Sequence, residues 1–313
     1  MKFSITVPAY KRRFLGECID SILAQTYKDF EVVIVNDASP EDLDSVVKAY
    51  NDSRIRYYVN EKNCGAVDVV DNWNICLRYA KGDYVICMGD DDRLLPNCLE
   101  EYSKLIAAYP GLGVYHAWTE IIDENSQVID MQEPRPLRED VYSMIWWRWH
   151  GRIQYIGDFL FDRALLVKNG GFYKIPLAWG SDDISTFIAA RDSGIANSQE
   201  PMFQYRRNSQ NISKTGDYKL KMETVNIMEQ WYSEFFKTPP ANASVSTETF
   251  WRLCKEKLPI QMSKKKVGQI YGSLDHSMLS RLIYFIRNQK RYHINIKHIG
   301  YAWIENMKSR FKE

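Results

Sequence analysis

The sequence lacks long apolar runs, paired cysteines and an excess of charge of either sign. No stretch approaches the roughly 18 uninterrupted apolar residues of a membrane span, and the N-terminal stretch MKFSITVPAY has no apolar segment of signal-peptide length. These two absences predict a cytoplasmic protein. The six cysteines form no C-x-x-C pair, which argues against a disulfide framework and predicts buried thiols. The net charge of +1 gives no general attraction to nucleic acid, so no such partner is expected.

Glycine-rich phosphate loops are also missing. No G-x-G-x-x-G or P-loop pattern follows the first strand-like segment, FSITVP, which argues against a dinucleotide dehydrogenase and an NTPase. A G-x-S-x-G nucleophile motif is absent too. With 313 residues, 45% of them hydrophobic, the chain can still bury a sizeable core. Its function must therefore rest on other polar groups.

Strand and helix signals alternate through the first third of the chain. FSITVP, FEVVIVND, IRYYVN and DYVICM read as strands, and each is followed by a segment with helical spacing of apolar residues. Continuous β-branched runs indicate strands buried on both faces, and helical crossovers imply a mostly parallel, Rossmann-like α/β sheet. From residue 111 the pattern loosens, and LGVYHAWTEIIDENSQVIDM predicts a hairpin.

Carboxylates collect where the predicted strands end. Asp37 follows the second strand and Asp90-Asp91-Asp92 follow the fourth, while Asp182-Asp183 opens a predicted helix. In such sheets ligands bind at the carboxyl ends of the strands. Three adjacent carboxylates repel one another unless a cation lies among them, and Mg²⁺ or Mn²⁺ commonly bridges carboxylates to phosphates. Each group alone could be a turn or a helix cap, but their joint placement favours a nucleotide diphosphate site.

Several motifs resemble family 2 glycosyltransferases of the GT-A fold. ITVPAYKRRFLGECIDSILAQTYKDFEVVIVNDAS is similar to the opening of that family, and AKGDYVICMGDDDRLLPNCLE to its Asp-x-Asp region. NGGFYKIPLAWGSDDISTFIAARDSG resembles its later segment, in which an acidic pair opens a helix, and YRRNSQNIS its closing arginine-containing strand. The resemblance covers about residues 3–213. It is specific to the family and not to a substrate.

The resemblance implies a role for each matching position of the nucleotide-sugar site. Pro8 and Tyr10 would line the base pocket, and Asp37 would accept a hydrogen bond from the base. The remaining roles fall on the acidic residues: Asp90 beside the ribose and metal, Asp91 as the metal ligand, Asp92 as an orienting group and Asp183 as the general base. Position 89 is Gly where family members often have Asp, so metal ligation would rest mainly on Asp91.

The implied protein is an inverting, metal-dependent glycosyltransferase of cell-surface polysaccharide synthesis. It would use a nucleotide-diphosphate sugar, a divalent cation (Mg²⁺ or Mn²⁺) and a saccharide or lipid-linked saccharide acceptor. Residues 1–215 would form the catalytic domain, with a nucleotide-binding half (1–110) and an acceptor and base half (111–215). Two alternatives stay open: a sugar-phosphate nucleotidyltransferase, and a non-catalytic protein that binds sugar nucleotides.

The C-terminal region, residues 216–313, is predicted to be helical and basic. From Lys255 to Glu313 there are 13 Lys+Arg and 4 Asp+Glu. Two stretches with helical spacing carry apolar residues beside the basic ones: Leu279, Leu282, Ile283, Phe285 and Ile286 in the first, and Trp303, Ile304, Met307 and Phe311 in the second. The helices could pack on the catalytic domain, mediate a homodimer or attach peripherally to the anionic cytoplasmic face of the inner membrane.

Overall fold

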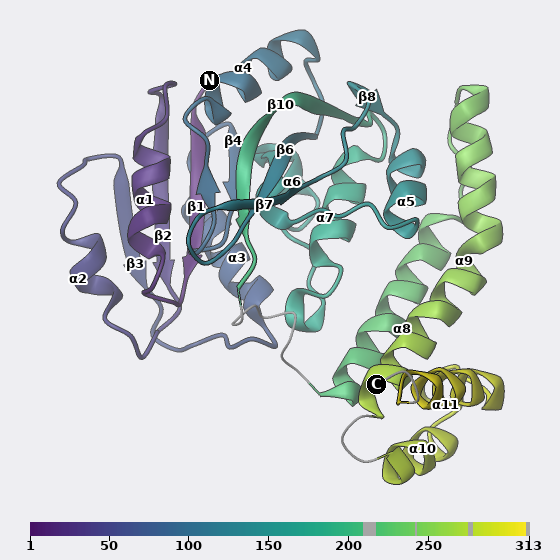
Figure 1. The fold of residues 1–313 in the computed structure, drawn as a ribbon. Helices are drawn as coiled ribbons and strands as arrows, with labels where there is room; N and C mark the ends of the chain where they lie inside the picture. The colour runs from purple at the N-terminus through teal and green to yellow at the C-terminus, as the bar shows by residue number, and fades with distance from the viewer. Residues whose placement is uncertain (209–216, 242, 275–277, 311–313) are drawn as a thin grey trace. The chain divides into compact units, whose positions relative to one another are not determined.

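The computed structural model of the chain describes residues 1–208, 217–241, 243–274 and 278–310. It divides into two compact units, Met1–Lys214 and Thr215–Glu313. Figure 1 labels the helices and strands of both. The predicted domain boundary between residues 215 and 216 lies outside the described residues. The assignment of residues 1–110 to the nucleotide and of residues 111–215 to the acceptor stays a prediction.

A ten-stranded sheet forms the centre of the N-terminal unit, in the order β3-β2-β1-β4-β9-β6-β10-β5, with β7 beside β6 and β8 beside β10. The strands are β1 (Phe3–Ala9), β2 (Phe30–Asn36), β3 (Ile55–Val59), β4 (Tyr84–Cys87), β5 (Arg93–Leu94), β6 (Val114–Ile122), β7 (Val128–Met131), β8 (Arg138–Glu139), β9 (Phe159–Asp162) and β10 (Ile195–Arg206). The first four pair in parallel, as the buried β-branched runs predicted.

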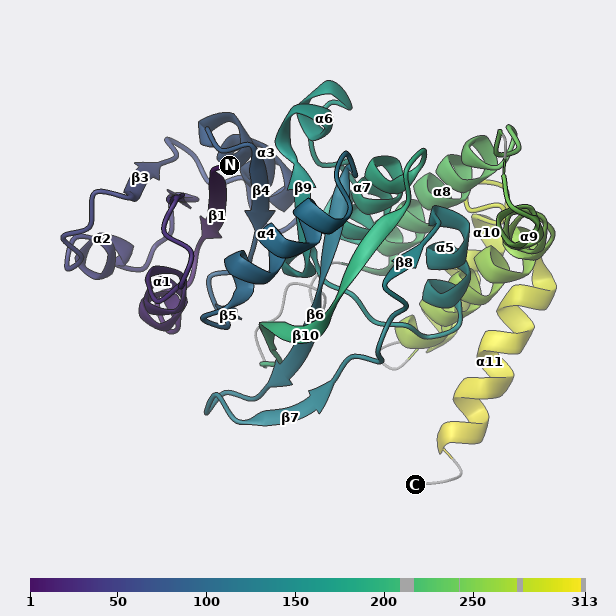
Figure 2. The same cartoon turned by 90° about the horizontal axis from the view of Figure 1, so that it is seen from above.

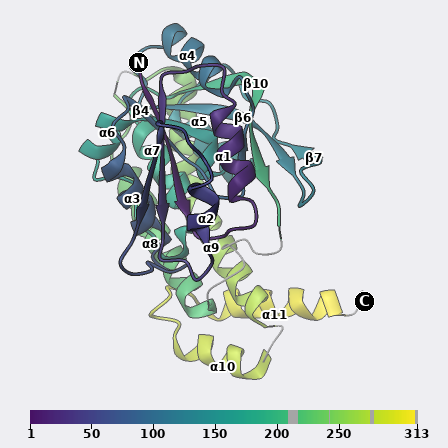
Figure 3. The ribbon, with the colours of Figure 1, turned by 90° about the vertical axis from the view of Figure 1, so that its left-hand side faces the viewer.

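The second half of the sheet is mixed. Strand β9 lies antiparallel between β4 and β6, and β10 runs parallel to β6. The predicted hairpin is confirmed, because β7 pairs antiparallel with β6 and extends from the edge of the sheet (Figure 3). Antiparallel partners need no helical crossover, which is why the helix-strand alternation fades in this part of the sequence.

Helices cover both faces of the sheet. Those of the N-terminal unit are α1 (Leu15–Leu23), α2 (Leu43–Val47), α3 (Val69–Tyr79), α4 (Cys98–Ala108), α5 (Val141–Trp149), α6 (Arg163–Lys168) and α7 (Ser181–Ala190), with 3-10 turns η1 (Ile156–Asp158) and η2 (Pro176–Ala178). Figure 2 shows α1, α2 and α4 on one face and α3, α6 and α7 on the other. The main core lies under the first group, where Ile5, Ile19 and Leu99 are fully buried.

The C-terminal unit is helical, as predicted for this region. Its helices are α8 (Tyr218–Phe235), α9 (Val245–Ser273), α10 (Met278–Arg287) and α11 (Ile296–Arg310). Met222, Ile270 and Phe285 form a small separate core. Lys266 is buried there and its Nζ donates to Glu229 Oε2 at 2.6 Å, which offsets the cost of burying the ammonium group.

The structure bears on two of the sequence observations, the lack of a membrane-spanning segment and the lack of paired cysteines. Among the described helices, none combines the length and the hydropathy that crossing a lipid bilayer requires. Five of the six cysteines are buried and Cys64 is half-buried; none of the six, all of which are described, forms a disulfide.

Candidate active site

The predicted nucleotide-sugar residues gather at one edge of the parallel strands. The register aligns Ala9 of β1 with Asn36 of β2, and Asn36 with Val59 of β3, so these strands end together. Asp37 follows β2 directly, and Asp90 lies three residues after the end of β4. This is the edge at which parallel sheets bind ligands, because the loops that follow the strands meet there.

Asp90 joins the loop after β1 to the loop after β4. Its Oδ2 accepts hydrogen bonds from the backbone N–H groups of Tyr10, at 2.6 Å, and Lys11, at 2.7 Å. The side chain is buried, and this burial, followed by the charge of Asp91, raises the pKa of Asp90 above its usual range. Two backbone donors stabilise the carboxylate but do not neutralise it.

Asp92 is fixed from the opposite side by β10. Its Oδ1 accepts a hydrogen bond from the backbone N–H of Arg206 at 2.9 Å. Burial, and then the charge of Asp91, raises the pKa of Asp92 well above its usual range. These contacts agree with the orienting role expected for this residue, which stays a prediction.

Asp91 lies between these two residues in the sequence, and its side chain contacts one cationic and one neutral side chain. Lys11 Nζ lies 4.0 Å from Asp91 Oδ2, and the side-chain amide of Asn208 donates to the same oxygen at 2.6 Å. Asn208 was not singled out from the sequence, although it belongs to the YRRNSQNIS segment. The part of that segment from residue 209 onward lies outside the described residues.

Gly89 leaves room for the carboxylates that follow it. A Cβ added there would lie 2.8 Å from Asp91 Oδ1 and 3.0 Å from Asp92 Oδ2. The first of these distances is shorter than real Cβ atoms show. Gly89 therefore allows the carboxylates of Asp91 and Asp92 to turn back over the strand end.

These residues fit a hard divalent cation. Asp90 and Asp92 are buried carboxylates with raised pKa values, and Asp91 supplies oxygen ligands between them. Within the described residues, no group of three or more His, Cys, Asp or Glu side chains is arranged to hold a metal by itself. In Mg²⁺ and Mn²⁺ sites one or two carboxylates commonly act together with substrate phosphates, so a cation bound here would also need oxygen ligands from the donor.

Asp37 lies in the turn after β2, and one of its carboxylate oxygens accepts two hydrogen bonds. Its Oδ1 accepts hydrogen bonds from Asn60 Nδ2 and from the backbone N–H of Cys64, both at 2.9 Å. The next residue, Ala38, has a positive φ of 47°, and Ser39 Oγ donates to the carbonyl of Tyr10 at 2.5 Å. The turns after β1 and β2 are thus tied together.

The other two residues expected at the base pocket differ in exposure. The side chain of Tyr10 is 42% exposed, so its ring face is open to stacking, whereas Pro8 lies half-buried within β1. Both positions are at the edge where Asp37 lies. Their roles in base binding stay predictions.

Asp183 lies in a second cluster, in the first turn of α7. Its Oδ1 accepts hydrogen bonds from Arg148 Nε at 2.8 Å and from Gln154 Nε2 at 2.7 Å. The helix begins after Gly180, which has a positive φ of 96° and supplies no side-chain cap. Burial, and then the charge of Asp183, raises the pKa of the neighbouring Asp182 above its usual range.

Arg148 and Gln154 are residues that the sequence interpretation missed. Arg148 belongs to the last turn of α5, within the aromatic run WWRWH, and Gln154 follows that helix. Gln154 also contacts the buried Arg135, whose Nη2 lies 3.3 Å from Gln154 Oε1. Arginine beside tryptophan is common in packed cores, so the local sequence carries little signal for this contact.

Two tyrosines lie between the clusters. The rings of Tyr155 and Tyr205 stack at 3.5 Å between centroids and 6° between planes. Burial, followed by the charge of Asp158, raises the pKa of Tyr155 to about 12, and Asp92 and Arg148 are both close enough to affect it. The structure therefore brings the predicted residues into two neighbouring groups: Pro8, Tyr10, Asp37 and Asp90 to Asp92 at the strand edge, and Asp183 with its arginine.

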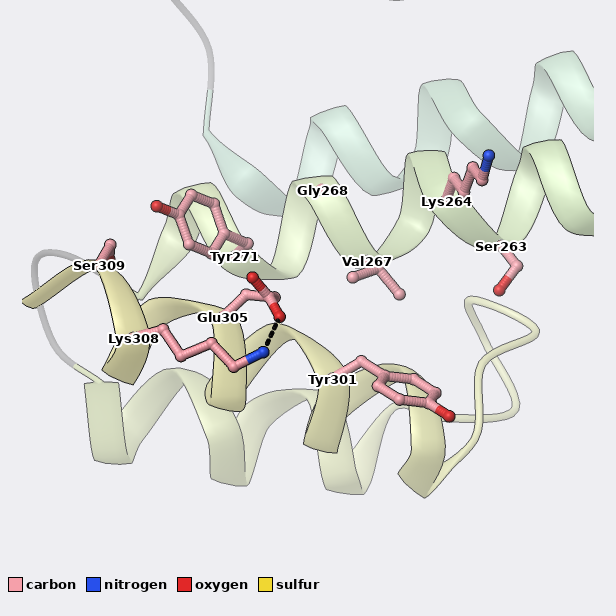
Figure 4. Close-up of a pocket in the computed structure, with 9 residues that line it drawn as sticks. All are labelled: Ser263, Lys264, Val267, Gly268, Tyr271, Tyr301, Glu305, Lys308 and Ser309. Atoms are coloured by element: carbon pink, nitrogen blue, oxygen red, sulfur yellow. Dashed lines mark hydrogen bonds and ion pairs between the residues drawn. The ribbon is translucent and has the colours of Figure 1, made fainter. Parts of the chain in front are cut away.

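A separate pocket of about 600 Å³ occurs in the C-terminal unit. It lies between α9 and α11 and is lined by residues that include Val267, Tyr271, Tyr301 and Lys308 (Figure 4). None of the predicted site residues contributes to it.

Comparisons with known sequences identify a family. The profile described as Glycosyl transferase family 2 matches residues 4–170. A glycosyltransferase of Rickettsia typhi, described as uncharacterized, is 27% identical over 65% of this chain, which spans 63% of that relative's length. WcaA of Escherichia coli, named as a glycosyl transferase of colanic acid biosynthesis, is 38% identical over 32% of this chain and 36% of its own.

Solved structures show the same fold. TarS of S. aureus, solved as residues 1–349 in complex with UDP-GlcNAc, has a TM-score of 0.60 and 19% identity, covering all of this chain and 93% of its own. The mannosyltransferase PcManGT of Pyrobaculum calidifontis was solved in complex with GDP-Man and Mn²⁺. It has a TM-score of 0.53 and 17% identity, and the match covers 97% of this chain and 86% of PcManGT. At these identities the likeness establishes the fold alone.

Proposed function

Because this chain belongs to glycosyl transferase family 2 and has the GT-A fold, we propose that it is an inverting, metal-dependent enzyme. It moves a sugar from a nucleotide-diphosphate sugar to an acceptor hydroxyl. The observation that carries this proposal is the contrast between its two carboxylate clusters. Asp91 lies beside two buried carboxylates that are held mainly by backbone N–H groups, with Lys11 Nζ 4.0 Å from Asp91 Oδ2, whereas Asp183 accepts a hydrogen bond from Arg148 Nε at 2.8 Å.

The donor would bind along the strand edge. Asp37 Oδ1 is already occupied by Asn60 and Cys64, so its Oδ2 is the oxygen that would accept an imide-type N–H of the base. Tyr10 would stack on the base and Pro8 would shape the pocket floor. The relatives in complex with UDP-GlcNAc and GDP-Man support a nucleotide-sugar donor and leave the base open.

Asp91 would hold the cation beside the donor diphosphate. A bound Mg²⁺ or Mn²⁺ supplies Lewis-acid stabilisation of the negative charge that develops on the leaving diphosphate. Asp90 keeps the loop after β1 against this position through its two backbone hydrogen bonds, and Asp92 fixes β10 against it. Asn208 Nδ2 donates to Asp91 Oδ2 at 2.6 Å and would hold this carboxylate in position.

Asp183 would act as the general base. Arg148 and Gln154 hold Oδ1, which orients the carboxylate and leaves Oδ2 for the acceptor hydroxyl. As the acceptor oxygen forms its bond to the anomeric carbon, the bond from that carbon to the phosphate oxygen breaks. The electron pair leaves on the diphosphate, and the hydroxyl proton moves to Asp183. Attack opposite the leaving group inverts the anomeric configuration.

The acceptor and the cellular setting are less specified. We propose a saccharide or lipid-linked saccharide in cell-surface polysaccharide synthesis, a setting supported by the similarity to WcaA. The cytoplasmic location and the homodimer expected from the sequence stay predictions.

One assay distinguishes the proposed reaction from the two alternatives. Purified protein is incubated with a panel of sugar nucleotides and acceptors, with Mn²⁺ or with a chelator, and the released products are identified. Metal-dependent release of nucleotide diphosphate together with an inverted glycosidic linkage is expected. Pyrophosphate turnover would instead identify a nucleotidyltransferase, and binding without any turnover a non-catalytic protein. A retained anomeric configuration would contradict Asp183 as a base acting in a single displacement.

A further inference from the structure

Helix α10 has two apolar faces, and only one of them is packed. Phe285 is fully buried in the core of the C-terminal unit, and Leu282 packs against the same core. Leu279, Ile283 and Ile286 are 72%, 42% and 46% exposed. Their spacing of four and three residues places them on one stripe of the helix. The sequence interpretation had grouped all five residues together, whereas the structure divides them between core and surface.

Helix α11 repeats this arrangement. Ile299 and Ala302 are buried in the same core, while Ile296, Trp303 and Ile304 are 60%, 42% and 42% exposed. The exposed three share one side of the helix, because residues four, seven and eight apart lie near the same stripe. Phe311, which was predicted to extend this stripe, lies outside the described residues. We call the six exposed residues of α10 and α11 the outer stripes.

Basic side chains accompany the outer stripes. Residues 278–310 contain seven Lys or Arg and one acidic residue, Glu305. Arg287, Lys290, Lys297 and Lys308 are exposed. Arg281 is different, because its guanidinium lies over the ring of Tyr218 at 3.8 Å and belongs to the packing of the unit. Lys308 pairs with Glu305 and Arg291 with Glu223 of α8, so the positive charge of this segment comes chiefly from Arg287, Lys290 and Lys297.

We propose that the outer stripes and their exposed basic residues dock on an anionic lipid bilayer. Apolar side chains would enter the boundary between headgroups and acyl chains, and the basic residues would contact anionic headgroups. The positive charge of this surface favours an anionic bilayer over a second copy of the chain as the binding partner. A symmetric dimer through the outer stripes would bring two equally positive surfaces together, whereas an anionic bilayer supplies the opposite charge.

The docked state differs from a membrane span. In the proposed docked state, α10 and α11 lie along the bilayer surface. The pocket between α9 and α11 is bordered by Tyr301, which is 62% exposed, and Lys308 (Figure 4). It would thus adjoin the docked surface of α11.

The docking surface contains none of the predicted catalytic residues, so the docking proposal can be tested independently of the proposed reaction.

Co-sedimentation with vesicles tests the proposal. The whole protein is mixed with phosphatidylglycerol-containing vesicles or with pure phosphatidylcholine vesicles, each at low and at high salt. Binding is expected to the anionic vesicles at low salt, with a marked loss at high salt because the headgroup attraction is screened. Equal recovery in the supernatant under all four conditions would overturn the proposal.

Two double variants separate the apolar and the charged contributions. Arg287→Gln with Lys290→Gln should weaken partitioning to anionic vesicles about thirtyfold, since each basic residue near the surface contributes about a factor of five. Ile283→Ser with Ile286→Ser should also reduce binding, and the remaining binding should be more sensitive to salt. Both pairs are exposed, so the fold should be retained, and circular dichroism checks this.

A matched control lies on the other unit. Val167 of α6 is 51% exposed and distant in sequence from the outer stripes, so Val167→Ser should bind vesicles like the parent. If the α10 variants also bind like the parent, the outer stripes are not the docking surface. A different result would identify a self-association site. In that case the parent would not bind vesicles but would form a dimer in sedimentation velocity, and Ile283→Ser with Ile286→Ser would abolish the dimer. The bilayer proposal would then be wrong.

Discussion

The two acidic clusters of the N-terminal unit are stabilised in opposite ways. The Asp90–Asp92 cluster is held mostly by backbone N–H groups, those of Tyr10, Lys11 and Arg206. Asp183 is held by side chains, and one of them is a guanidinium at 2.8 Å. Backbone donors orient a carboxylate without adding a unit of charge, whereas an arginine compensates it fully.

This difference separates the two kinds of chemistry. Three adjacent carboxylates, with Lys11 Nζ 4.0 Å from Asp91 Oδ2, gain much from a divalent cation, because the cation reduces the repulsion among them. A carboxylate that is already paired has less to gain from a metal. The hydrogen bond from Arg148 instead fixes the orientation of the Asp183 carboxylate, and a general base requires a fixed orientation. Three of the predictions below change one of the two clusters, and the fourth, at Asp37, leaves both clusters intact.

The largest effect is expected at the Asp90–Asp92 cluster. Asp91→Asn should lower turnover by about a thousandfold or more, because the amide removes the charge that would hold the cation on the diphosphate. Product release measured across a Mn²⁺ titration should then be flat. A variant activated by Mn²⁺ as strongly as the parent would show that Asp91 is not the metal ligand.

Substitution of Asp183 should change the rate of transfer and not the affinity for the donor. Asp183→Asn should lower transfer by about a hundredfold to a thousandfold while donor affinity is unchanged, because a general base acts on the acceptor proton. Calorimetry with the nucleotide diphosphate and steady-state kinetics measure the two separately. If the residue only supported the helix start, the variant would lose about 1 kcal/mol of stability and keep near-parental rates.

Asp37 tests the donor side without touching either cluster. Asp37→Ala should weaken nucleotide binding by roughly 1–3 kcal/mol, the usual cost of leaving a buried donor unpaired. The measurement is calorimetric titration with several nucleotide diphosphates, and Asn60→Ala is a useful companion because it releases one hydrogen bond to Asp37. Equal affinity in Asp37→Ala and parent would remove Asp37 from base recognition.

The smallest effect should come from the arginine that pairs with the base. Arg148→Gln should lower kcat about tenfold with donor affinity unchanged, because Asp183 loses its charged partner and its fixed orientation. Arg148→Lys keeps the charge and should recover part of the rate. Arg138→Gln is the matched control, because that exposed arginine contacts only a backbone carbonyl, of Ser193, among the described hydrogen bonds. If Arg148→Gln kept the parental kcat, the pairing of Arg148 with Asp183 would not contribute to catalysis.

The parallel half of the fold could be predicted from the sequence because its signals are local. Runs such as FEVVIVND identify buried strands, and parallel strands joined by helices end at a common edge. That reasoning placed Asp37 and the Asp90–Asp92 cluster at the strand edge, where the structure has them. The roles of these residues stay predictions until they are measured.

The partners of the site residues could not be predicted in the same way. Arg148 reaches Asp183 across 35 positions, and Asn208 reaches Asp91 across 117. Such contacts depend on where β9 and β10 insert in the sheet, which no local periodicity specifies. The outer stripes illustrate a related gap, because helical spacing reveals an apolar arc but not which part of it is buried.

Arg206 limits how freely the loops around the site can be exchanged. Its buried guanidinium donates to the carbonyls of Asp91 and Asp123, to Ser126 Oγ and to Glu17 Oε2. These acceptors belong to the loop after β4, the β6–β7 turn and α1. A chimera that imported a foreign β6–β7 turn would leave one nitrogen of a buried cation without acceptors, at a cost of about 1–3 kcal/mol. Changes in specificity are therefore expected to come from coordinated replacement of these segments, not from swapping one of them.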